Sequence, residues 1–548
     1  GDGDHLNFSW LKLTASKQEF QRSFYSQHLE FFVIRLVRSR FDRLTSKKFY
    51  SMYFLGVESA TRATRAIVVD LDSACVVASA TAPHSFIEGL PAGHLEQDPA
   101  DWVTALDQAV RGCLHQLGPK KDEVVAMAVG GQSKGMVILD QKNQIIRPAK
   151  VAGDRSTGKQ VDQFNREFGG PPGLCELTGN ALDEDGLAAQ ILWLKEREPY
   201  NFQKAASVMQ PRDFLNYWLT GVPRAEMGDA SRTGLLDVKT GNWHEMIIEF
   251  IDPRLFEMLL PLGGDAPSLG GLRKEVLQSW GLSREILVSA GSGSVMMSAL
   301  ASGSSHLGTA VLELGVTGAV WGLSAQPHVD PRNEVSMWCD ATHQWLAHFE
   351  EDQAVASLEM VQDHYGWNGQ QMELAASSSE IGAGGLMALP LGHGTKHQSG
   401  EGMFYGITMR NFTPSNMARA TLEGIAVRLA YGYHRMSELG IDFGTVCVTG
   451  RGAGSQFWRQ LIADVCGVKS YSLKNQEGAA LGAAIHAAVA YFQQTGEGLS
   501  FSEMAAYAVI TDEESWCEPD EGRHQFYLNQ LSKQQYLAET LIGSGFLV

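Results

Sequence analysis

The alternation of apolar and polar positions predicts two successive α/β units. In the first unit, three short apolar runs around polar turns precede a stretch of helical periodicity and a buried run that ends at two glycines. These lie at residues 53–57, 66–70, 76–82, 102–117 and 124–129. A second alternation begins near residue 307, with strands expected at 311–314, 319–323 and 446–448 and helices at 417–439 and 478–493. Two such units predict a bilobal α/β protein with a cleft.

Residues 1–52 precede the first unit and have a different pattern. Ser16 and Glu19 have the spacing of a capping box, and apolar positions then follow at helical spacing, from Phe20 to Leu44. We expect an N-terminal basic helical extension. One interpretation packs this helix on the protein's own body. Others dock it on a protein partner or a membrane surface.

Charge and cysteine content restrict the class of protein. The formal net charge is −18, and residues 1–52 hold nine Lys and Arg against five Asp and Glu, so the remainder carries −22. Such an acidic body argues against a nucleic-acid partner. No apolar run reaches the 18 residues of a membrane span, so a transmembrane protein is not expected. The seven cysteines are scattered without a CxxC pair, which favours a soluble protein in a reducing compartment, either the cytoplasm or an organelle matrix such as that of the mitochondrion.

The most specific motif spans residues 402–423. Gly402, Phe404, Gly406 and Ile407 are followed, after eight residues, by a run that ends at Glu423. This arrangement resembles the second signature of the FGGY carbohydrate kinases at each constrained position, and a gapped pattern of this length is far more specific than a lone glycine motif. Further resemblances follow in the family's order at residues 95–102, 181–197, 210–221, 228–231, 449–464 and 477–484.

The resemblance is closest to xylulokinases and covers about residues 53–495. It implies the two-lobed actin/hexokinase-type (ribonuclease H-like) fold, which closes over ATP, Mg²⁺ and a sugar. We expect a sugar-binding-type lobe at 53–305 and a nucleotide-binding-type lobe at 306–495. The chain would add the extension at 1–52 and another at 496–548.

The nucleotide side of the implied site departs from the family pattern at several positions. The first phosphate turn, D-x-G-T in the family, has Glu58 and Thr61 at its ends. Glu58 is also the candidate magnesium ligand, although its extra methylene moves the carboxylate by about a bond length. The second turn, GTSG in the family, keeps Gly315 and Thr317 around a valine. Residues 449–455 resemble the adenosine-binding segment, with Gly450, Gly452 and Ala453 as candidate nucleotide-binding residues.

The segments that would bind the sugar differ from the family pattern, and the aspartate that would act as the catalytic base is absent from its expected position. Gln132 and Lys134 stand in the segment that reads GQMHG in xylulokinases, and Asp154 is kept from a downstream W-N-D-x-R segment. The turn that carries the family's essential aspartate has Ser294 instead. A serine hydroxyl cannot accept a proton at neutral pH without a base of its own. Asp154 or Asp229 could substitute only if the fold brings it there.

The departures concentrate on catalysis while the scaffold signature is intact. We therefore favour a pseudokinase, a catalytically impaired kinase-shaped scaffold that serves as a structural or regulatory subunit, with residues 1–52 as the attachment point for protein partners. The alternative is an active kinase that phosphorylates a pentulose such as xylulose or a related polyol. ATP and Mg²⁺ would be required in that case, whereas the scaffold could function with no cofactor.

Overall fold

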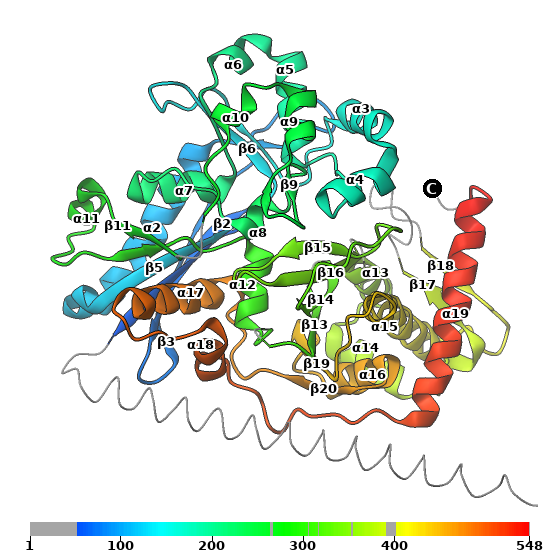
Figure 1. The fold of residues 1–548 in the computed structure, drawn as a ribbon. Helices are drawn as coiled ribbons and strands as arrows, with labels where there is room; N and C mark the ends of the chain where they lie inside the picture. The colour runs from blue at the N-terminus through cyan, green and yellow to red at the C-terminus, as the bar shows by residue number, and fades with distance from the viewer. Residues whose placement is uncertain are drawn as a thin grey trace, which may run out of the picture.

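The computed structural model describes residues 52–263, 267–304, 306–315, 317–351, 354–390 and 402–546. It has two lobes that meet at a waist (Figure 1). The expected α/β class and bilobal architecture are confirmed. The helix expected within residues 1–52 lies outside the described residues. No helix in the described ranges is long and apolar enough to cross a bilayer.

The core of the first lobe is a six-stranded mixed sheet. The order is β11-β12-β5-β1-β2-β3, with β1 antiparallel to β2 and parallel to β5. Strand β1 is buried along nearly its whole length, as an apolar run in a central strand requires. The bounds are β1 Tyr53–Ser59, β2 Ala63–Asp70, β3 Cys75–Pro83, β5 Val124–Gly131, β11 Ser268–Gly271 and β12 Leu287–Ser289.

The second lobe repeats this topology. Its sheet runs β15-β16-β14-β13-β19-β20, and β13 is antiparallel to β14 and parallel to β19. Strands β1 and β13 are thus equivalent, each ending in a hairpin turn. The bounds are β13 Thr309–Leu314, β14 Gly318–Ser324, β15 Ser336–Cys339, β16 Trp345–Glu351, β19 Thr445–Gly450 and β20 Lys469–Ser472.

A helical cap extends the first lobe at the top of Figure 1. Its strands form a four-stranded sheet, β4-β7-β6-β8, and the pair β9-β10. The strand bounds are β4 Glu96–Gln97, β6 Gly135–Leu139, β7 Ala149–Val151, β8 Ser207–Met209, β9 Leu236–Asp237 and β10 Asn242–Trp243. The helices are α3 Gly158–Phe168, α4 Gly170–Thr178, α5 Leu187–Arg197, α6 Pro199–Lys204, α9 Glu245–Ile251 and α10 Leu255–Met258.

The other helices cover the two main sheets. Those within the first lobe are α2 Pro99–Leu117, the 3₁₀ turn η1 Gly118–Glu123, α7 Pro211–Thr220, α8 Met227–Ala230, α11 Lys274–Ser279 and α12 Ser294–Ala301. Those of the second lobe are α13 Ala354–Tyr365, α14 Gly369–Ser377, the turn η2 Ala383–Gly385, α15 Pro414–Glu438 and α16 Gln456–Cys466. The chain ends with α17 Gly478–Gln494, α18 Phe501–Ala508 and α19 Glu521–Gly543, and the hairpin β17 Met387–Leu389 with β18 Met403–Tyr405 lies near α19 (Figure 1).

Helix α17 follows the second sheet in sequence but packs on the first. It contacts β1, β5 and α12 (Figure 1). Two glycines permit the approach: a Cβ on Gly56 would lie 1.9 Å from Ala480 O, and a Cβ on Gly482 would lie 1.8 Å from Met297 O. One hydrophobic cluster therefore includes buried residues of both lobes, among them Phe54 and Val311.

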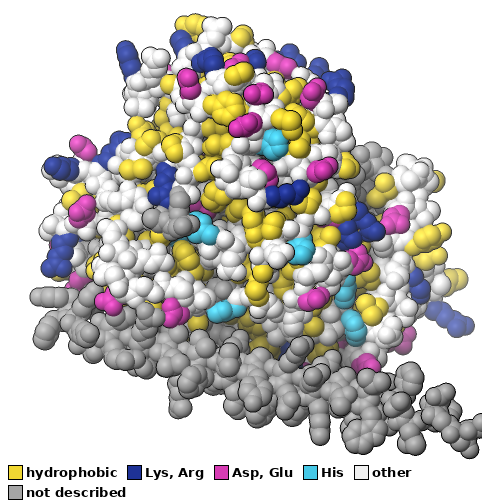
Figure 2. Space-filling view, viewed as in Figure 1, with side chains coloured by type: hydrophobic (Ala, Val, Ile, Leu, Met, Phe, Trp, Pro, Cys, Tyr) yellow, Lys and Arg dark blue, Asp and Glu magenta, His cyan; other side chains and the backbone are white. Residues whose placement is uncertain are grey.

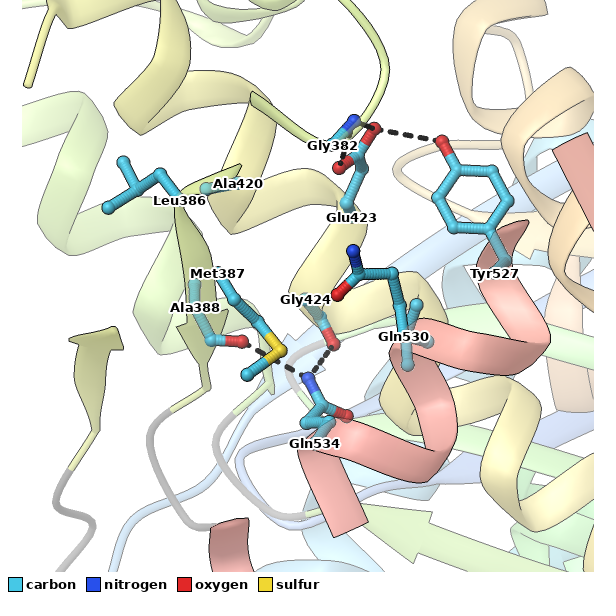
Figure 3. Close-up of a pocket in the computed structure, with 11 residues that line it drawn as sticks. Gly382, Leu386, Met387, Ala388, Ala420, Glu423, Gly424, Tyr527, Gln530 and Gln534 are labelled. Atoms are coloured by element: carbon cyan, nitrogen blue, oxygen red, sulfur yellow. Dashed lines mark hydrogen bonds between the residues drawn. The ribbon is translucent and has the colours of Figure 1, made fainter. Parts of the chain in front are cut away.

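The signature helix α15 holds the C-terminal helix in place. Glu423, the last residue of the signature, accepts hydrogen bonds from the Tyr527 hydroxyl at 2.8 Å and from Gly382 N at 3.1 Å (Figure 3). Two turns further along α19, Gln534 Nε2 donates to Ala388 O and Gly424 O, both at 3.1 Å. These bonds surround a small pocket that lies apart from the waist, so this part of the signature has a structural role.

Candidate functional site

The ends of strands β1 and β5 bring three candidate residues together. Glu58 is the last residue but one of β1, and Gln132 N donates to Ser59 O at 2.9 Å. Gln97 Nε2 donates to Thr61 O at 2.6 Å, and Gln132 Nε2 donates to Gln97 Oε1 at 3.1 Å. Gln97, within the segment at residues 95–102, thus connects the first turn to Gln132 by hydrogen bonds. This geometry positions Glu58, Thr61 and Gln132 along one edge of the first sheet.

Ser294 begins helix α12 at the same edge. Gly293, the N-cap residue, bridges to Gly131, so Ser294 follows directly on a residue paired with the end of β5. The Ser294 Oγ atom is buried and has no hydrogen-bond partner. A buried hydroxyl without a hydrogen-bond partner lowers the free energy of unfolding by about 1–3 kcal/mol. Such groups are rare in protein cores and more typical of functional positions. The helix N-terminus there favours a negative charge that serine does not supply.

Asp229 lies beside this position but is fully engaged. A Cβ on Gly293 would lie 2.5 Å from Asp229 Oδ1, which shows how close the carboxylate is. Oδ1 accepts from Ser133 Oγ at 2.6 Å, and Oδ2 accepts from Arg212 Nε at 2.5 Å. Asp229 is completely buried, so it cannot reach a ligand without breaking this ion pair.

Arg212 is the centre of a buried charge network. Its Nη2 also donates to Asp213 Oδ1 at 2.6 Å, and its Nη1 donates to Ala290 O at 2.7 Å. Burial raises the pKa of Asp213 to about 7, against the opposing charge of Arg212. Burial likewise raises the pKa of Glu226 to about 7. One guanidinium therefore balances three buried acids, and the network is a structural element of the first lobe.

Asp154 is likewise occupied. It is fully buried, and its carboxylate accepts from Lys150 Nζ at 3.1 Å and from Leu95 N at 2.8 Å. With His94 and Glu96 it forms the one group of three metal-ligating side chains in the described ranges whose ligand atoms lie within 4.8 Å of one another. Because the Lys150 ammonium also lies 3.5 Å from Glu96, this group already holds a cation. Asp154 and Asp229 are therefore both engaged in buried ion pairs with cationic side chains.

Lys134 lines a cavity of about 290 Å³ between the lobes. Its ammonium contacts Asp183 Oδ2 at 2.6 Å and Asp185 Oδ1 at 2.9 Å. Burial by itself would lower the pKa of Lys134, but the two carboxylates outweigh it and the pKa is raised. The backbone of Lys134 has φ = 61°, a left-handed conformation that costs a non-glycine residue about 1 kcal/mol or more.

The lobes are hydrogen-bonded to each other at the rim of this cavity. Asn180 Nδ2 donates to Met337 O, and Met337 N donates to Asn180 Oδ1, both at 2.8 Å. Cys339 N donates to Ser231 Oγ at 3.0 Å. Strand β15 of the second lobe therefore lies against the first-lobe segments that line the cavity. Figure 2 shows acidic and basic side chains close together along this waist.

Acidic side chains near the ends of β1 and β13 lie close enough to influence one another electrostatically. Burial raises the pKa of Glu313 to about 7, and the neighbouring carboxylates of Glu350 and Glu58 add to the effect. Burial also raises the pKa of Glu58, against the opposing charge of Arg65. Glu58 and Glu313 are each the last residue but one of the equivalent strands β1 and β13, so the pseudo-symmetry of the fold places two carboxylates together. A polyphosphate entering here would meet a concentration of like charge.

We expect Glu313→Gln to change the pH dependence of stability. The folded-state pKa lies above the unfolded value, so the native chain holds an extra proton at pH 5 and loses stability as pH rises through about 7. The variant should match the unchanged chain at pH 5 and exceed its free energy of unfolding by about 1–3 kcal/mol at pH 8. Urea unfolding at both pH values measures this. Glu359→Gln, at an exposed ion pair, is the control, and a difference that does not vary with pH would contradict the prediction.

One of the five nucleotide-side candidates lines a second cavity, of about 240 Å³. Gly315 N donates to Thr317 O at 3.1 Å in the turn after β13. Gly450, at the end of β19, has φ = 78°, and a Cβ there would lie 2.5 Å from Leu314 O. Gly452 lines the cavity, whereas Ala453 is fully buried and does not line it.

Arg451, between Gly450 and Gly452, lines this cavity and leaves it open. Arg451 Nη1 pairs with Glu359 on α13 at 2.6 Å, and both side chains are more than half exposed. The cavity therefore persists beside it, lined also by Met372 and Trp458. Its volume and its largely apolar lining suit a ring system of a small ligand.

Sequence reasoning did not single out several residues that shape the site. Glu313, Glu350, Arg212 and Arg232 carry no motif of their own, since their importance comes from burial and from neighbours distant in sequence. The run Asp183-Glu184-Asp185 was visible as an acidic stretch within the signature-like segment at 181–197. Three consecutive acids beside an expected sugar segment are the signal that could have identified the partners of Lys134.

Family models and related sequences both identify the chain as similar to carbohydrate kinases. Residues 53–301 match the N-terminal domain and residues 287–491 the C-terminal domain of the FGGY family of carbohydrate kinases. The chain is 29% identical over 486 residues to a xylulose kinase of Haemophilus influenzae, covering 87% of this chain and 97% of that one. It is 29% identical over 446 residues to a xylulose kinase of Escherichia coli, covering 80% and 90%.

Solved structures share the fold. A ligand-bound xylulose kinase of Lactobacillus acidophilus superposes with a TM-score of 0.82 at 20% sequence identity, covering 90% of this chain and 99% of that one. A glycerol kinase of Plasmodium falciparum with ADP gives 0.78 at 18% identity, covering 89% and 98%. These likenesses support the actin/hexokinase-type architecture expected from the motifs.

Proposed function

Because the chain belongs to the FGGY family of carbohydrate kinases, we propose that it is a xylulokinase-like member impaired in phosphoryl transfer that serves as a structural or regulatory subunit. One observation carries the proposal. At the position where the family resemblance requires a base, Ser294 presents a hydroxyl, and Asp229, which lies close to the preceding Gly293, is buried in an ion pair with Arg212. A positioned base contributes about 10²–10⁴ in rate, so its loss alone makes a slow enzyme.

The acids around the hairpin turns support the same conclusion. In phosphoryl transfer the protein acts by positioning and by stabilising negative charge. Here the carboxyl groups of Glu58, Glu313 and Glu350 lie near one another, and when ionised they would oppose the negative charge of phosphates held at these turns. The cavity between the lobes persists, however, so the proposal is a scaffold that keeps its ligand cavities rather than one that has filled them.

The direct test is an ADP-release assay with ATP and Mg²⁺ over a panel of pentuloses and polyols. The expected result is no sugar-dependent ADP above the sugar-free rate for any member of the panel. A thermal-shift titration with ATP and Mg²⁺ should accompany it, because ligand at 100 times Kd stabilises a folded protein by about 2.7 kcal/mol. Saturable ADP release with one sugar would refute the impairment.

The second candidate is an active kinase of xylulose or a related polyol. The likeness to xylulose kinases and the open 240 Å³ cavity favour it. Oxygen ligands suit Mg²⁺, which proteins commonly bind through one or two carboxylates together with substrate phosphates, and Glu58 could supply one of them. When bound, the ion would neutralise charge on the phosphates. This candidate requires a proton acceptor from outside the groups described above.

The regulatory part of the proposal rests on residues 1–52. Their excess of Lys and Arg over Asp and Glu contrasts with the acidic remainder of the chain, and the family resemblance does not extend to them. We infer that they attach the scaffold to a protein partner. A pull-down with and without residues 1–52 tests this. Identical partners in both samples would show that the extension is not the attachment point.

A further inference from the structure

The 290 Å³ cavity between the lobes contains an arginine with an unsatisfied donor. Arg232 and Lys134 both line it. Lys134 is paired with two carboxylates, whereas the Nε of Arg232 is buried without a hydrogen-bond partner and no carboxylate pairs with its guanidinium among the described residues. An N–H donor that is buried without a partner is costly, and arginine cannot lose its proton to relieve the cost.

The guanidinium is held in a defined place. Its central carbon lies 4.2 Å from the centre of the Trp338 ring, which is itself stacked on His348 at 4.3 Å. The preceding residue, Ser231, is fixed by the hydrogen bond that its Oγ accepts from Cys339 N. Stacking uses the flat face of the guanidinium and leaves its N–H edge for hydrogen bonds. This arrangement fits the bidentate binding of a planar anion.

The rest of the cavity suits hydroxyl groups and disfavours a dianion. Asp183 and Asp185 line it beside Lys134, and carboxylates accept hydrogen bonds from hydroxyls. Glu184 and Glu350 also line it, so acids outnumber bases among the lining side chains. A phosphate group carries nearly two negative charges at neutral pH and would be repelled. A carboxylate carries one charge and matches the guanidinium in shape.

We propose that this cavity binds an aldonate, a small polyol with a terminal carboxylate, with the carboxylate on Arg232 and the hydroxyls directed to Asp183 and Asp185. The inference rests on the proposed function only in taking this cavity as a ligand site. It requires neither ATP nor phosphoryl transfer, so binding and turnover can be tested separately.

The experiment is isothermal titration calorimetry of the full chain without nucleotide. The ligands are D-xylonate and D-gluconate, the neutral polyol xylitol, D-xylulose, and xylulose 5-phosphate as the phosphate-bearing probe. Both aldonates should bind at least about tenfold more tightly than xylitol. Arg232→Met should raise the aldonate Kd by about 10- to 100-fold, the range for losing hydrogen bonds to a charged group. The same change should leave the Kd of xylitol within about threefold.

Arg155→Met is the matched control, because Arg155 is an exposed arginine on the same cavity. It removes the same charge and should change the aldonate Kd by less than about threefold. If Arg232→Met fails to fold, Arg232→Lys replaces it: the charge is kept, the bidentate edge is lost, and a selective rise in aldonate Kd is still expected.

Three results would overturn the inference: aldonates no tighter than xylitol, equal effects of the two Met variants, or tighter binding of the sugar phosphate. ADP release with xylulose, alongside Arg232-dependent aldonate binding, would refute the proposed impairment and leave this inference standing. Absence of aldonate binding, together with no sugar-dependent ADP release, would refute this inference and leave the proposed impairment standing.

Discussion

A Ser294→Asp variant is expected to release ADP in a xylulose-dependent manner at about 10²–10⁴ times the rate of the unchanged chain, because it restores a positioned base. The new carboxylate would stand at the first residue of α12, where the helix N-terminus favours negative charge. It would also stand beside the bridge between Gly131 and Gly293, next to the end of β5. A coupled ADP assay over a xylulose titration measures the gain.

The matched control for this variant is Ser294→Asn, which has the size and shape of aspartate but cannot accept the proton. We expect it to remain as slow as the unchanged chain. Equal rates for the Asp and Asn variants would mean that shape rather than basicity limits the reaction. A full gain to the activity of ordinary kinases is not expected, because Glu58, with its longer side chain, still alters the first turn.

Replacing Arg212 should give the largest loss of stability in the first lobe. Arg212→Met leaves Asp213, Glu226 and Asp229 without their common counter-charge, and breaking a buried ion pair costs about 3–5 kcal/mol. Urea unfolding followed by circular dichroism measures it. The cost should be larger at pH 8 than at pH 5. The pKa values of Asp213 and Glu226 are raised to about 7, so acid neutralises the carboxylates left behind, whereas at pH 8 they remain charged.

The double variant Arg212→Met with Asp229→Asn separates this explanation from simple loss of packing. Removing one of the stranded charges should recover part of the stability at pH 8. A double variant as unstable as the single one, or a cost that does not change with pH, would show that Arg212 acts mainly by filling space.

The bilobal fold could be predicted because its signals are local. Each strand of the two hairpins is a short apolar run, and the signature at 402–423 fixes a long helix behind a turn. The expected strand at 53–57 extends to Ser59, and the expected helix at 417–439 begins three residues earlier, where Thr413 caps it. Boundaries shifted because caps and strand pairing, rather than apolar periodicity, decide where an element ends.

The candidate site was predictable only in part, because its chemistry depends on contacts between distant segments. The sequence identifies Ser294 as a departure from the family pattern, but it does not say whether another acid takes over. That answer needs the fold, which ties Asp229 to Arg212 and Asp154 to Lys150. The raised pKa of Glu313 likewise arises from burial and from carboxylates on other strands, which no local motif encodes.

The packing of α17 on β1 and β5 has a consequence for synthesis on the ribosome. The first strand is synthesised more than four hundred residues before the helix that covers it. Its apolar face therefore stays uncovered until most of the chain has been made. During that interval the nascent first lobe exposes surface that chaperones bind and proteases cut. The first lobe therefore completes its folding only when the second lobe does, and the two lobes fold as one cooperative unit.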